Sequence, residues 1–512
     1  MQVIEIYNGV ENMKPQTIAV LDVGKTNKKV LIYDLQFNVL VSSTESFPEI
    51  EKNGLQHEQP EAVFTWLCDT LSKFSEKYAI KAISVTTHGA TIMCVDEAGN
   101  LTAPPLSYTN TTEPGFADEF YSKFGTRDHL QEATATAEVG DLINAGKMVY
   151  FLKKNFPTEF DATKWILSYP QYFGFKLTGC AGAEPTMLGC HSYLLNPHKH
   201  TYSEVAEKLD IIDKLPPTVN NSWENLGKIS AEISAKTGVD ADCVVTYGVH
   251  DSNASLVPYL ISDSKKFILD STGTWCVAMR PSEKVEFTED EIGKLVFYNM
   301  DIFKNPVKTS IFMGGLEYET YMTILKEKFP SKELPDFDAD LYQSVIDKCS
   351  EFVLPSVTKG TGIFPQSPPR VVDGEKTVGL EDLKAGNDSP AFMDDFDRTC
   401  AILILSLVIQ TAKAFEYADM EDGDTIFVEG GFRHNQPYLT MLKAFYPTSR
   451  VCTTEIKEAT ALGSAICGLA LLEGKRPDEL TTKVEIGAID VPDTPAINIK
   501  AYMDKFVALT EQ

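Results

Sequence analysis

The sequence lacks the features that mark several common classes of protein. Basic residues are outnumbered, 46 Lys and Arg against 73 Asp and Glu, which gives a formal net charge of −27. We therefore expect no nucleic-acid partner and no membrane partner, because anionic phosphate surfaces bind to basic patches. The 10 cysteines form no C-x-x-C pair and stand at no zinc spacing with the 8 histidines. Scattered thiols of this kind are typical of reduced core residues in a cytoplasmic protein.

Long hydrophobic runs are also missing. The longest, residues 401–410, is interrupted by Ser406 and is shorter than the roughly 20 apolar residues that span a bilayer, so we expect it to be part of a buried helix. The N-terminal residues contain early acids and no long apolar region, and we expect no signal peptide. At about 100–200 residues per domain, a chain of 512 residues predicts two or more domains.

A P-loop is absent, although Gly24-Lys25-Thr26 is similar to the end of one. That motif needs a glycine five positions before its second glycine, and Ala19 stands there. It also needs a helix after the threonine, where this chain has the β-rich run 29–33.

The chain does contain one hairpin pattern twice. An apolar strand, an acid, a turn rich in Gly and Thr and a second apolar strand occur in this order at residues 17–33 and again at residues 266–279. The two acids, Asp22 and Asp270, are separated by nearly half of the chain. This repeat predicts two lobes of similar design. We place the N-terminal lobe at residues 1–258 and the C-terminal lobe at residues 259–512.

Between the hairpins lies the stretch VVTYGVHDSNASLVPYL, residues 244–260. An apolar run breaks at Gly248 and small residues follow Asp251, which predicts a strand, a glycine turn and a helix. The first-turn N–H groups of that helix would favour the ionised form of Asp251. An ionised carboxylate at a strand end can act as a general base, but Asp is also a common N-cap. Taken alone, the stretch favours the cap.

Two further strand ends carry candidate ligand contacts. One strand ends in Thr87-His88-Gly89, where the histidine either contacts a ligand or has a structural role. Another ends in Gly430-Gly431, which either admits a ligand to the backbone or simply turns the chain. Together with the hairpin turns, these segments are suited to the oxygens of a polyphosphate. Asp22 is then placed to hold Mg²⁺ through water.

Six segments in this order resemble the FGGY family of carbohydrate kinases. They are DVGKTNKKVLIYD from Asp22, THGA from Thr87, YGVHDSNAS from Tyr247, DSTGTW from Asp270, EGGFRHNQPYL from Glu429 and EATALGSAICGLA from Glu458. The resemblance implies an α/β fold with two ribonuclease-H-like lobes of the actin/hexokinase-like superfamily and a cleft between them. It also implies ATP and Mg²⁺ as cofactors, and a homodimer.

The resemblance further implies a role for each matching residue. Asp251 matches the catalytic base that deprotonates the sugar hydroxyl, and Asp22 matches the acid that helps to hold Mg²⁺. The cofactor-binding positions are Gly24, Lys25, Thr26, Asn27 and Lys29 in a first phosphate loop, Gly273 and Thr274 in a second, and Gly430, Gly431 and Asn435 in the adenosine pocket. The sugar-contacting positions are His88, Gly89, Asn110 and His250.

Two positions depart from the family pattern. Lys25 stands where many members have Thr or Ser, so that its ammonium either reaches a phosphate or points to solvent. Asn110, two positions after Tyr108, stands where many members have Asp, so that its sugar contact would carry no charge. The opening DxGKTN is most similar to the branch of L-rhamnulose and L-fuculose kinases. Xylulose, ribulose and polyol kinases are the alternatives.

Two other classes of function stay open on the sequence alone. One class is a non-catalytic nucleotide-binding module of actin or chaperone type. This function would not account for Asp251 in the position of a general base, or for the sugar-contacting segment at His88. A sugar sensor without catalysis would be expected to lose Asp251 or a phosphate turn. We therefore expect an ATP-dependent kinase for the terminal hydroxyl of a ketose, with a 6-deoxy-ketohexose as the first choice.

Overall fold

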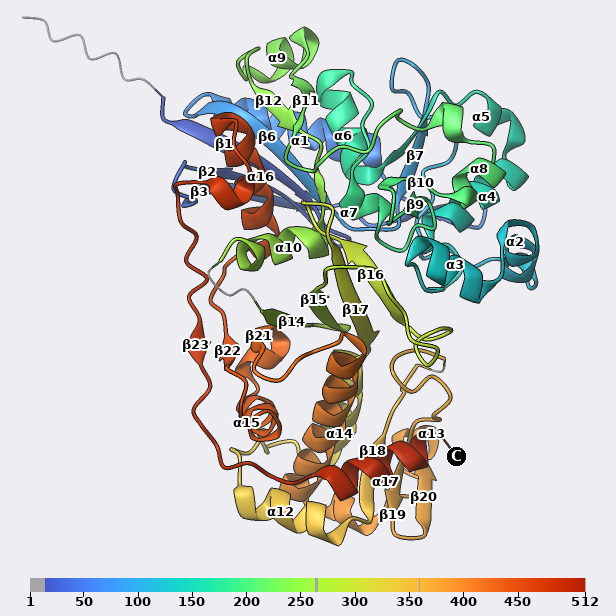
Figure 1. The fold of residues 1–512 in the computed structure, drawn as a ribbon, viewed down its shortest axis with the longest axis vertical. Coiled ribbons are helices and arrows are strands. Elements are labelled where there is room, and N and C mark those ends of the chain that lie inside the picture. The colour runs from blue at the N-terminus through green and yellow to red at the C-terminus, as the bar shows by residue number, and fades with distance from the viewer. Residues whose placement is uncertain (1–13, 263–265, 359, 512) are drawn as a thin grey trace, which may run out of the picture.

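The computed structural model describes residues 14–262, 266–358 and 360–511. In this part of the chain two lobes are each built on a seven-stranded sheet (Figure 1). The first sheet has the order β11-β12-β6-β1-β2-β3, and β13 pairs with β6. Its strands are β1 (Gln16–Val23), β2 (Asn27–Tyr33), β3 (Val39–Ser46), β6 (Ala79–Thr87), β11 (Asn225–Lys228), β12 (Val244–Thr246) and β13 (Val249–His250).

The second sheet repeats this design in the order β16-β17-β15-β14-β21-β22-β23. In each sheet an antiparallel hairpin, β1–β2 or β14–β15, adds a third antiparallel strand, β3 or β17. The first strand of each hairpin pairs on its other side with a parallel strand, β6 or β21. The strands are β14 (Phe267–Thr272), β15 (Cys276–Pro281), β16 (Val296–Met300), β17 (Pro306–Phe312), β21 (Thr425–Gly430), β22 (Val451–Thr453) and β23 (Ile489–Asp490). The predicted two lobes of similar design are confirmed, whereas the boundary between residues 258 and 259 stays a prediction.

The first strand of each hairpin is almost continuously buried, as is usual for strands whose sheet is covered on both faces. The turn predicted at 270–274 begins later than expected. Asp270 lies inside β14, because Ser271 and Thr272 continue the pairing with β15. Asp22 likewise lies inside β1, paired with Lys29.

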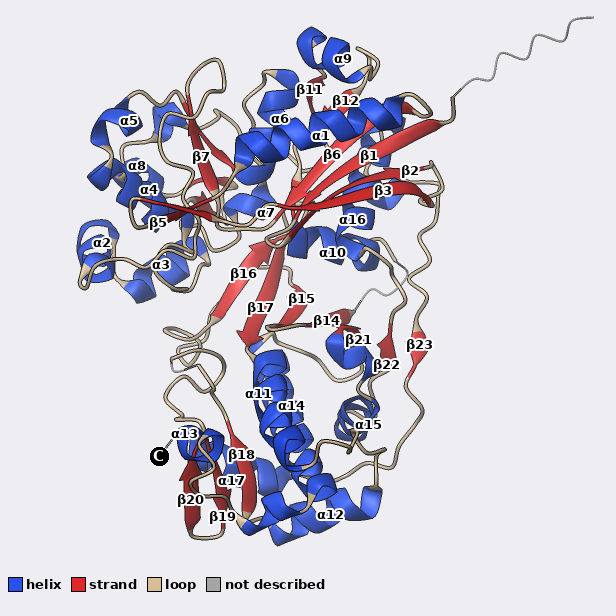
Figure 2. Ribbon diagram, turned by 180° about the vertical axis from the view of Figure 1, so that it is seen from behind, coloured by secondary structure: helices blue, strands red, loops and turns tan. Residues whose placement is uncertain are grey.

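Helices cover both faces of the first sheet, with α1 and α6 on one side and α10 and α16 on the other (Figure 2). The helices are α1 (Pro60–Ser75), α2 (Phe116–Phe124), α3 (Arg127–Thr134), α4 (Ala145–Asn155), α5 (Pro157–Asp161), α6 (Tyr169–Thr178), α7 (Pro185–Leu188), α8 (Glu204–Lys208), α9 (Ala231–Thr237), α10 (Asp251–Leu260), α11 (Gly314–Lys328), α12 (Ala339–Lys348), α13 (Leu380–Lys384), α14 (Phe396–Tyr417), α15 (Gln436–Phe445), α16 (Ala459–Glu473) and α17 (Lys500–Thr510). Shorter sheets use β4 (Ile50–Lys52), β5 (Leu55–His57), β7 (Ile92–Val95), β8 (Trp165–Ser168), β9 (Leu195–Asn196), β10 (Thr201–Tyr202), β18 (Glu351–Leu354), β19 (Arg370–Asp373) and β20 (Lys376–Gly379).

One helix from late in the chain packs on the first lobe. The red α16 lies beside the blue strands β1 and β6 and against α10 (Figure 1). The approach is close: a Cβ at Gly463 would lie 1.8 Å from the carbonyl oxygen of Ala254, so only glycine fits there. Ser464 Oγ also donates to Ser84 Oγ at 2.8 Å. The small residues of α16 therefore let the second half of the chain hold the helix that carries Asp251.

Among the described residues, α14 is the one helix that is long and apolar enough to cross a membrane, judged by length and composition alone. It has 22 residues and is longer than the run 401–410 suggests, because it begins at Phe396 behind the N-cap Asp395. However, 89% of its most apolar window is buried inside the protein. The prediction of a buried helix is confirmed.

Candidate active site

Three predicted site residues lie at neighbouring strand ends. The parallel strands β1 and β6 pair Asp22 with Thr86, two residues before His88. Strand β13 also pairs in parallel with β6, and this pairing places His250 opposite Thr87, the residue that precedes His88. Because the carboxyl ends of parallel strands meet at one edge of a sheet, Asp22, His88 and Asp251 come together there.

Asp251 is the first residue of α10 rather than its N-cap, which is His250. Its side chain is 31% exposed, so a substrate can reach it. The backbone N–H of Ser252 donates to Asp251 Oδ1 at 2.6 Å, as expected at a helix start. Burial outweighs this bond and the nearby His88, and it raises the pKa of the Asp251 carboxyl. The N–H bond thus acts in the predicted direction, towards the ionised form, although burial outweighs it. A raised pKa makes the carboxylate a better proton acceptor.

His250 lies beside the same carboxylate. Its Nε2 is 3.2 Å from Asp251 Oδ1 and 3.5 Å from Cys190 Sγ, and its Nδ1 is 3.0 Å from Asn253 Nδ2. Burial lowers the pKa of His250 to about 4, so the ring is neutral at pH 7. A Cβ at Gly89 would lie 2.9 Å from His250 Nε2, which places these two predicted sugar contacts side by side.

Asp22 carries a carboxyl that the protein alone does not compensate. It is 8% exposed, and burial, Asp251 and Glu458 raise its pKa to about 7 although Lys29 acts in the opposite direction. Lys29 is itself paired with Glu458, at 2.5 Å. Within the described residues, no group of three or more His, Cys, Asp or Glu side chains could hold a metal ion. The nearly buried carboxyl of Asp22 by itself fits Mg²⁺, which keeps several waters and binds one or two carboxylates together with phosphates.

His88 is 4% exposed and presents one free ring nitrogen. Its Nδ1 lies 3.1 Å from the carbonyl oxygen of Gly89 and therefore carries the proton. Burial, followed by the charge of Lys25, lowers the pKa of His88 to about 4, so that Nε2 is an acceptor at pH 7. That Nε2 is buried and has no partner among the described residues. Because buried polar atoms are nearly always hydrogen-bonded, this nitrogen is suited to a ligand hydroxyl.

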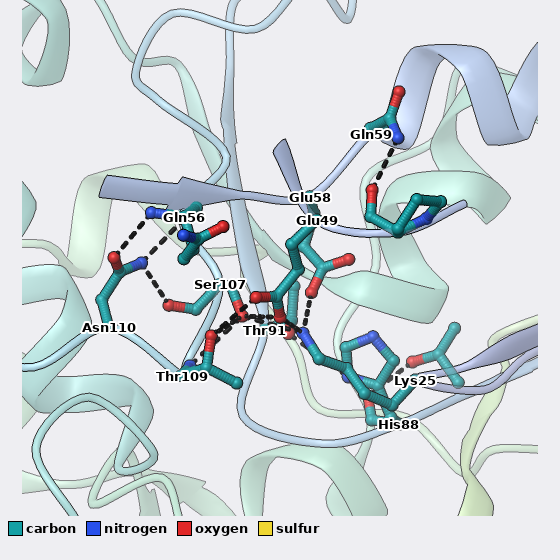
Figure 3. Close-up of polar contacts among 12 residues, drawn as sticks. Lys25, Glu49, Gln56, Glu58, Gln59, His88, Thr91, Ser107, Thr109 and Asn110 are labelled. Atoms are coloured by element: carbon teal, nitrogen blue, oxygen red, sulfur yellow. Dashed lines mark hydrogen bonds and ion pairs between the residues drawn. The ribbon is translucent and has the colours of Figure 1, made fainter. Parts of the chain in front are cut away.

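Asn110 is bound to the main chain (Figure 3). Its Oδ1 accepts from the backbone N–H of Gln56 at 2.7 Å. Its Nδ2 donates to the carbonyl oxygens of Gln56 at 2.7 Å and of Ser107 at 2.8 Å. These bonds use both amide hydrogens and one lone pair of Oδ1, so that only the second lone pair is left for the sugar contact predicted for Asn110, which stays a prediction. The residue braces β5 against the loop that carries Tyr108.

The ammonium of Lys25 is bound within the protein. It pairs with Glu49 and Glu58 and donates to Ser107 Oγ at 2.8 Å (Figure 3). Neither predicted alternative, a phosphate contact or an exposed ammonium, describes this arrangement. The other predicted positions of the loop keep some exposed surface: Gly24, Thr26, Asn27 and Lys29.

A cavity of about 400 Å³ lies in the second lobe, at the ends of β14 and β21. Its lining includes the predicted nucleotide positions Gly273, Thr274, Gly431 and Asn435. Asn435 also caps α15, since its Oδ1 accepts from the backbone N–H of Tyr438 at 3.1 Å. The exposed Gly and Thr of the turn thus share one cavity with the Gly-Gly strand end.

Gly430 shapes this cavity without lining it. Its φ is +77°, and a Cβ there would lie 1.7 Å from the carbonyl oxygen of Thr272. Only glycine adopts this conformation at such a contact. The neighbouring Phe432 N–H donates to Thr272 Oγ1 at 2.9 Å, which fixes the turn against β14.

Two family models match the chain in succession. The N-terminal domain of the FGGY family of carbohydrate kinases matches residues 17–258, and the C-terminal domain of carbohydrate kinase FGGY matches residues 264–477. The chain belongs to the FGGY family of carbohydrate kinases.

Curated relatives of this FGGY chain include L-fuculokinase of Salmonella typhi, 25% identical over 281 residues, and rhamnulokinase of Halalkalibacterium halodurans, 24% identical over 261 residues. These alignments cover 54% and 50% of the chain, and they span 58% and 54% of the length of the two relatives.

Solved structures match over nearly the full chain. A carbohydrate kinase from Novosphingobium aromaticivorans has a TM-score of 0.78 at 24% identity and covers 98% of this chain and 99% of its own. A ligand-bound xylulose kinase from Lactobacillus acidophilus has a TM-score of 0.76 at 16% identity and covers 97% of each chain. The predicted α/β fold of two lobes is confirmed.

Several residues of these pockets were not predicted from the sequence. Tyr318 and Phe432 line the cavity of the second lobe, with ring centroids 5.7 Å apart. The ring of Tyr108 lies 5.7 Å from that of His88, and Glu458 pairs with Lys29. Glu458 could have been found, because it begins a segment that resembles the family. Tyr108 could have been found, because it lies two positions before the predicted sugar contact Asn110. Tyr318 lies on α11, where the sequence shows no such segment.

Proposed function

We propose that this FGGY protein is an ATP-dependent kinase that phosphorylates the terminal hydroxyl of a ketose. The observation that carries the proposal is the meeting of Asp22, His88 and Asp251 at one sheet edge. They supply a carboxyl suited to Mg²⁺, a free hydrogen-bond acceptor and a carboxylate with a raised pKa. Phosphoryl transfer needs little more than such positioning and charge neutralisation.

In this proposal the sugar binds between the lobes and donates one hydroxyl to His88 Nε2. Asp251 accepts the proton of the terminal hydroxyl while that oxygen attacks the γ-phosphorus of ATP. The bond from this phosphorus to its bridging oxygen breaks, and ADP leaves. The nucleotide lies in the cavity at Gly273 and Gly431, and the hydroxyl of Thr274 in the same lining bears developing charge. Mg²⁺ held by Asp22 would neutralise the phosphates, and closure of the lobes would exclude water.

The charges near His88 favour a neutral sugar. The rings of His88 and His250 are neutral at pH 7, and the ammonium of Lys25 is balanced by two carboxylates, Glu49 and Glu58. These side chains therefore leave no unpaired positive charge for the carboxylate of a sugar acid. We place a 6-deoxy-ketohexose such as L-rhamnulose or L-fuculose first, because L-fuculokinase and rhamnulokinase are among the relatives. Xylulose, ribulose and polyols are the second choice.

A coupled ADP-release assay tests this proposal. Purified protein with Mg²⁺ and ATP is given L-rhamnulose, L-fuculose, both xyluloses, both ribuloses, glycerol and gluconate in turn. Turnover on one neutral ketose supports the proposal and names the sugar. Turnover on gluconate alone would contradict the charge argument. ATP hydrolysis that does not depend on sugar would favour a chaperone-like module, and ATP binding without turnover would favour a sensor.

The cytoplasmic location expected from the scattered thiols stays a prediction, as does the homodimer implied by the family resemblance. Light scattering on the purified protein tests the homodimer directly, since a particle of 56.7 kDa, the mass of one chain, would exclude the dimer.

A further inference from the structure

Lys25 occupies the turn between β1 and β2, within the first phosphate loop, but its ammonium faces a different part of the molecule. Its Nζ pairs with the carboxylates of Glu49 and Glu58. It also donates to Ser107 Oγ at 2.8 Å and lies 4.6 Å from the centre of the Tyr108 ring. An ammonium has three hydrogens, and these oxygens account for all of them. Lys25 thus has no N–H left for a phosphate.

Of the two ion pairs of Lys25, loss of the one with Glu58 should destabilise the protein more. Glu58 is 3% exposed, so its charge has little water around it. Burial alone would lower the pKa of Lys25, but Glu58 and Glu49 together raise it, so that the lysine stays charged. A buried carboxylate that loses its paired cation is strongly destabilised, whereas removal of both charges is much less harmful.

The acceptors of Lys25 come from the segments around His88. Glu49 and Glu58 flank the β4–β5 ribbon, and Ser107 precedes Tyr108 in the loop that Asn110 braces. Figure 3 shows the Lys25 side chain beside the His88 ring, with the two carboxylates above it. Tyr108 lies near both Lys25 and His88, since the centre of its ring is 4.6 Å from the Lys25 ammonium and 5.7 Å from the centre of the His88 ring.

The cluster is cross-linked beyond Lys25. Glu49 accepts from Ser107 Oγ at 2.5 Å and from Thr109 Oγ1 at 2.8 Å. On the loop side, Lys28 Nζ donates to the carbonyl oxygen of Lys25 at 2.8 Å, and Lys28 is 1% exposed. The backbone and the ammonium of Lys25 are therefore both fixed, and the residue joins the phosphate loop to the ribbon and to the Tyr108 loop.

We propose that Lys25 is a positioning residue of the sugar pocket and not a phosphate ligand: through Glu58 and Glu49 it holds the loop that places Tyr108 against His88. This inference rests on the proposed sugar-kinase function. It assigns to Lys25, where many family members have Thr or Ser, a part in sugar affinity that acts through its two carboxylate partners.

A charge-pair cycle tests the inference. Lys25→Met, Glu58→Gln and the double variant are compared with the wild type for ketose KM, for the Kd of ATP and for Tm. We expect Lys25→Met to raise the ketose KM by about ten-fold or more, and to leave the Kd of ATP within about two-fold. Addition of Glu58→Gln should bring the ketose KM back to within about three-fold of the wild type, because the buried charge of Glu58 is then no longer left without Lys25.

Two lysines serve as controls. Lys29 lies in the same loop, next to the Asp22 carboxyl, and Lys29→Met should weaken ATP binding rather than sugar binding. Lys81 forms an ion pair with Asp240 on the surface, and Lys81→Met should change none of the three quantities. If Lys25→Met fails to fold, the double variant alone decides, since it keeps a low ketose KM only if Lys25 acts through Glu58.

Three results would overturn the inference. The first is a weakened Kd of ATP with an unchanged ketose KM in Lys25→Met, which is the behaviour of a phosphate ligand. The second is a double variant no better than Lys25→Met. The third is a loss of all functions in proportion to Tm, which is the behaviour of a merely structural residue. Failure of the wild type to turn over any ketose would instead refute the proposed function, so the two failures are distinguishable.

Discussion

Asp251→Asn is the substitution that bears most directly on the proposed mechanism. Asparagine has the shape of aspartate, and its Oδ1 can still accept the N–H of Ser252, now 2.6 Å from Asp251 Oδ1. The start of α10 should therefore be kept. What is lost is the ability to take a proton. Removal of a general base costs about 10²- to 10⁴-fold in rate, and we expect kcat to fall by at least about 10²-fold, or roughly 2.7 kcal/mol of transition-state stabilisation.

The structure also predicts that Asp251→Asn keeps the affinity for ATP and shifts the pKa of Asp22. The nucleotide cavity lies in the second lobe, so the Kd of ATP should stay close to that of the wild type. Asp251 is one of the causes that raise the pKa of Asp22 to about 7. Loss of this negative neighbour favours the ionised form of Asp22, and its pKa should fall. The acid limb of the residual activity should then lie at lower pH than in the wild type.

The assay is ADP release at saturating ketose and ATP, over pH 5.5 to 9, with nucleotide binding measured separately by calorimetry. Asp242→Asn is the matched control, because Asp242 is a surface acid of the same lobe whose side chain is 84% exposed. A kcat of Asp251→Asn within about ten-fold of the control would refute the assignment of the base. An unchanged acid limb would refute the coupling to Asp22.

Three further predictions follow from single groups. Asp22 has a pKa of about 7 before metal binds and must lose its proton to hold Mg²⁺. The affinity for Mg²⁺ should therefore fall about ten-fold per pH unit as the pH drops below 7. An Mg²⁺ affinity that calorimetry finds unchanged between pH 5.5 and 7 would contradict this role. Gly430→Ala should abolish nucleotide binding, because its Cβ would lie 1.7 Å from the carbonyl oxygen of Thr272; ATP bound with wild-type Kd would show that the turn yields. Asp270 is 1% exposed, and burial raises its pKa to about 7 against a weaker opposing bond from Tyr438. Its folded-state pKa lies above the unfolded one, so its contribution favours the fold at low pH and is lost as the pH rises through 7. Asp270→Asn should therefore raise Tm at pH 8 and much less at pH 5, and an equal gain at both pH values would exclude this cause.

The sequence predicted those parts of the site that depend on neighbours along the chain. Asp22 lies near the end of an apolar strand, His88 follows one and Asp251 begins the helix after one. The parallel pairing of β1 and β13 with β6 brings these three positions together. The same holds for Gly273 and Gly431, which follow the corresponding strands of the second sheet and share one cavity. Apolar runs and small-residue turns are visible in the sequence, so this much of the fold and of the site could be predicted.

Side-chain partners distant in sequence could not be predicted in this way. The amide of Asn110 is taken by Gln56 and Ser107, and the ammonium of Lys25 by Glu49 and Glu58. No local pattern relates these residues. The pKa of Asp251 shows the same limit, because the helix start can be predicted from the sequence but the burial that outweighs it cannot.

Helix α10, which carries the proposed base, links the two sheets and so bears on how the lobes can close. At its start, Asp251 stands at the edge of the first sheet. Near its end, the Tyr259 hydroxyl donates to Glu429, at the end of β21 in the second sheet, and lies 2.7 Å from Thr454 Oγ1. Between these points α16 packs on α10 at Gly463 with no room for a side chain. The proposed base is therefore held by both halves of the chain, and any closure that brings nucleotide to sugar must turn about α10 and α16 while it keeps Asp251 at the edge of the first sheet.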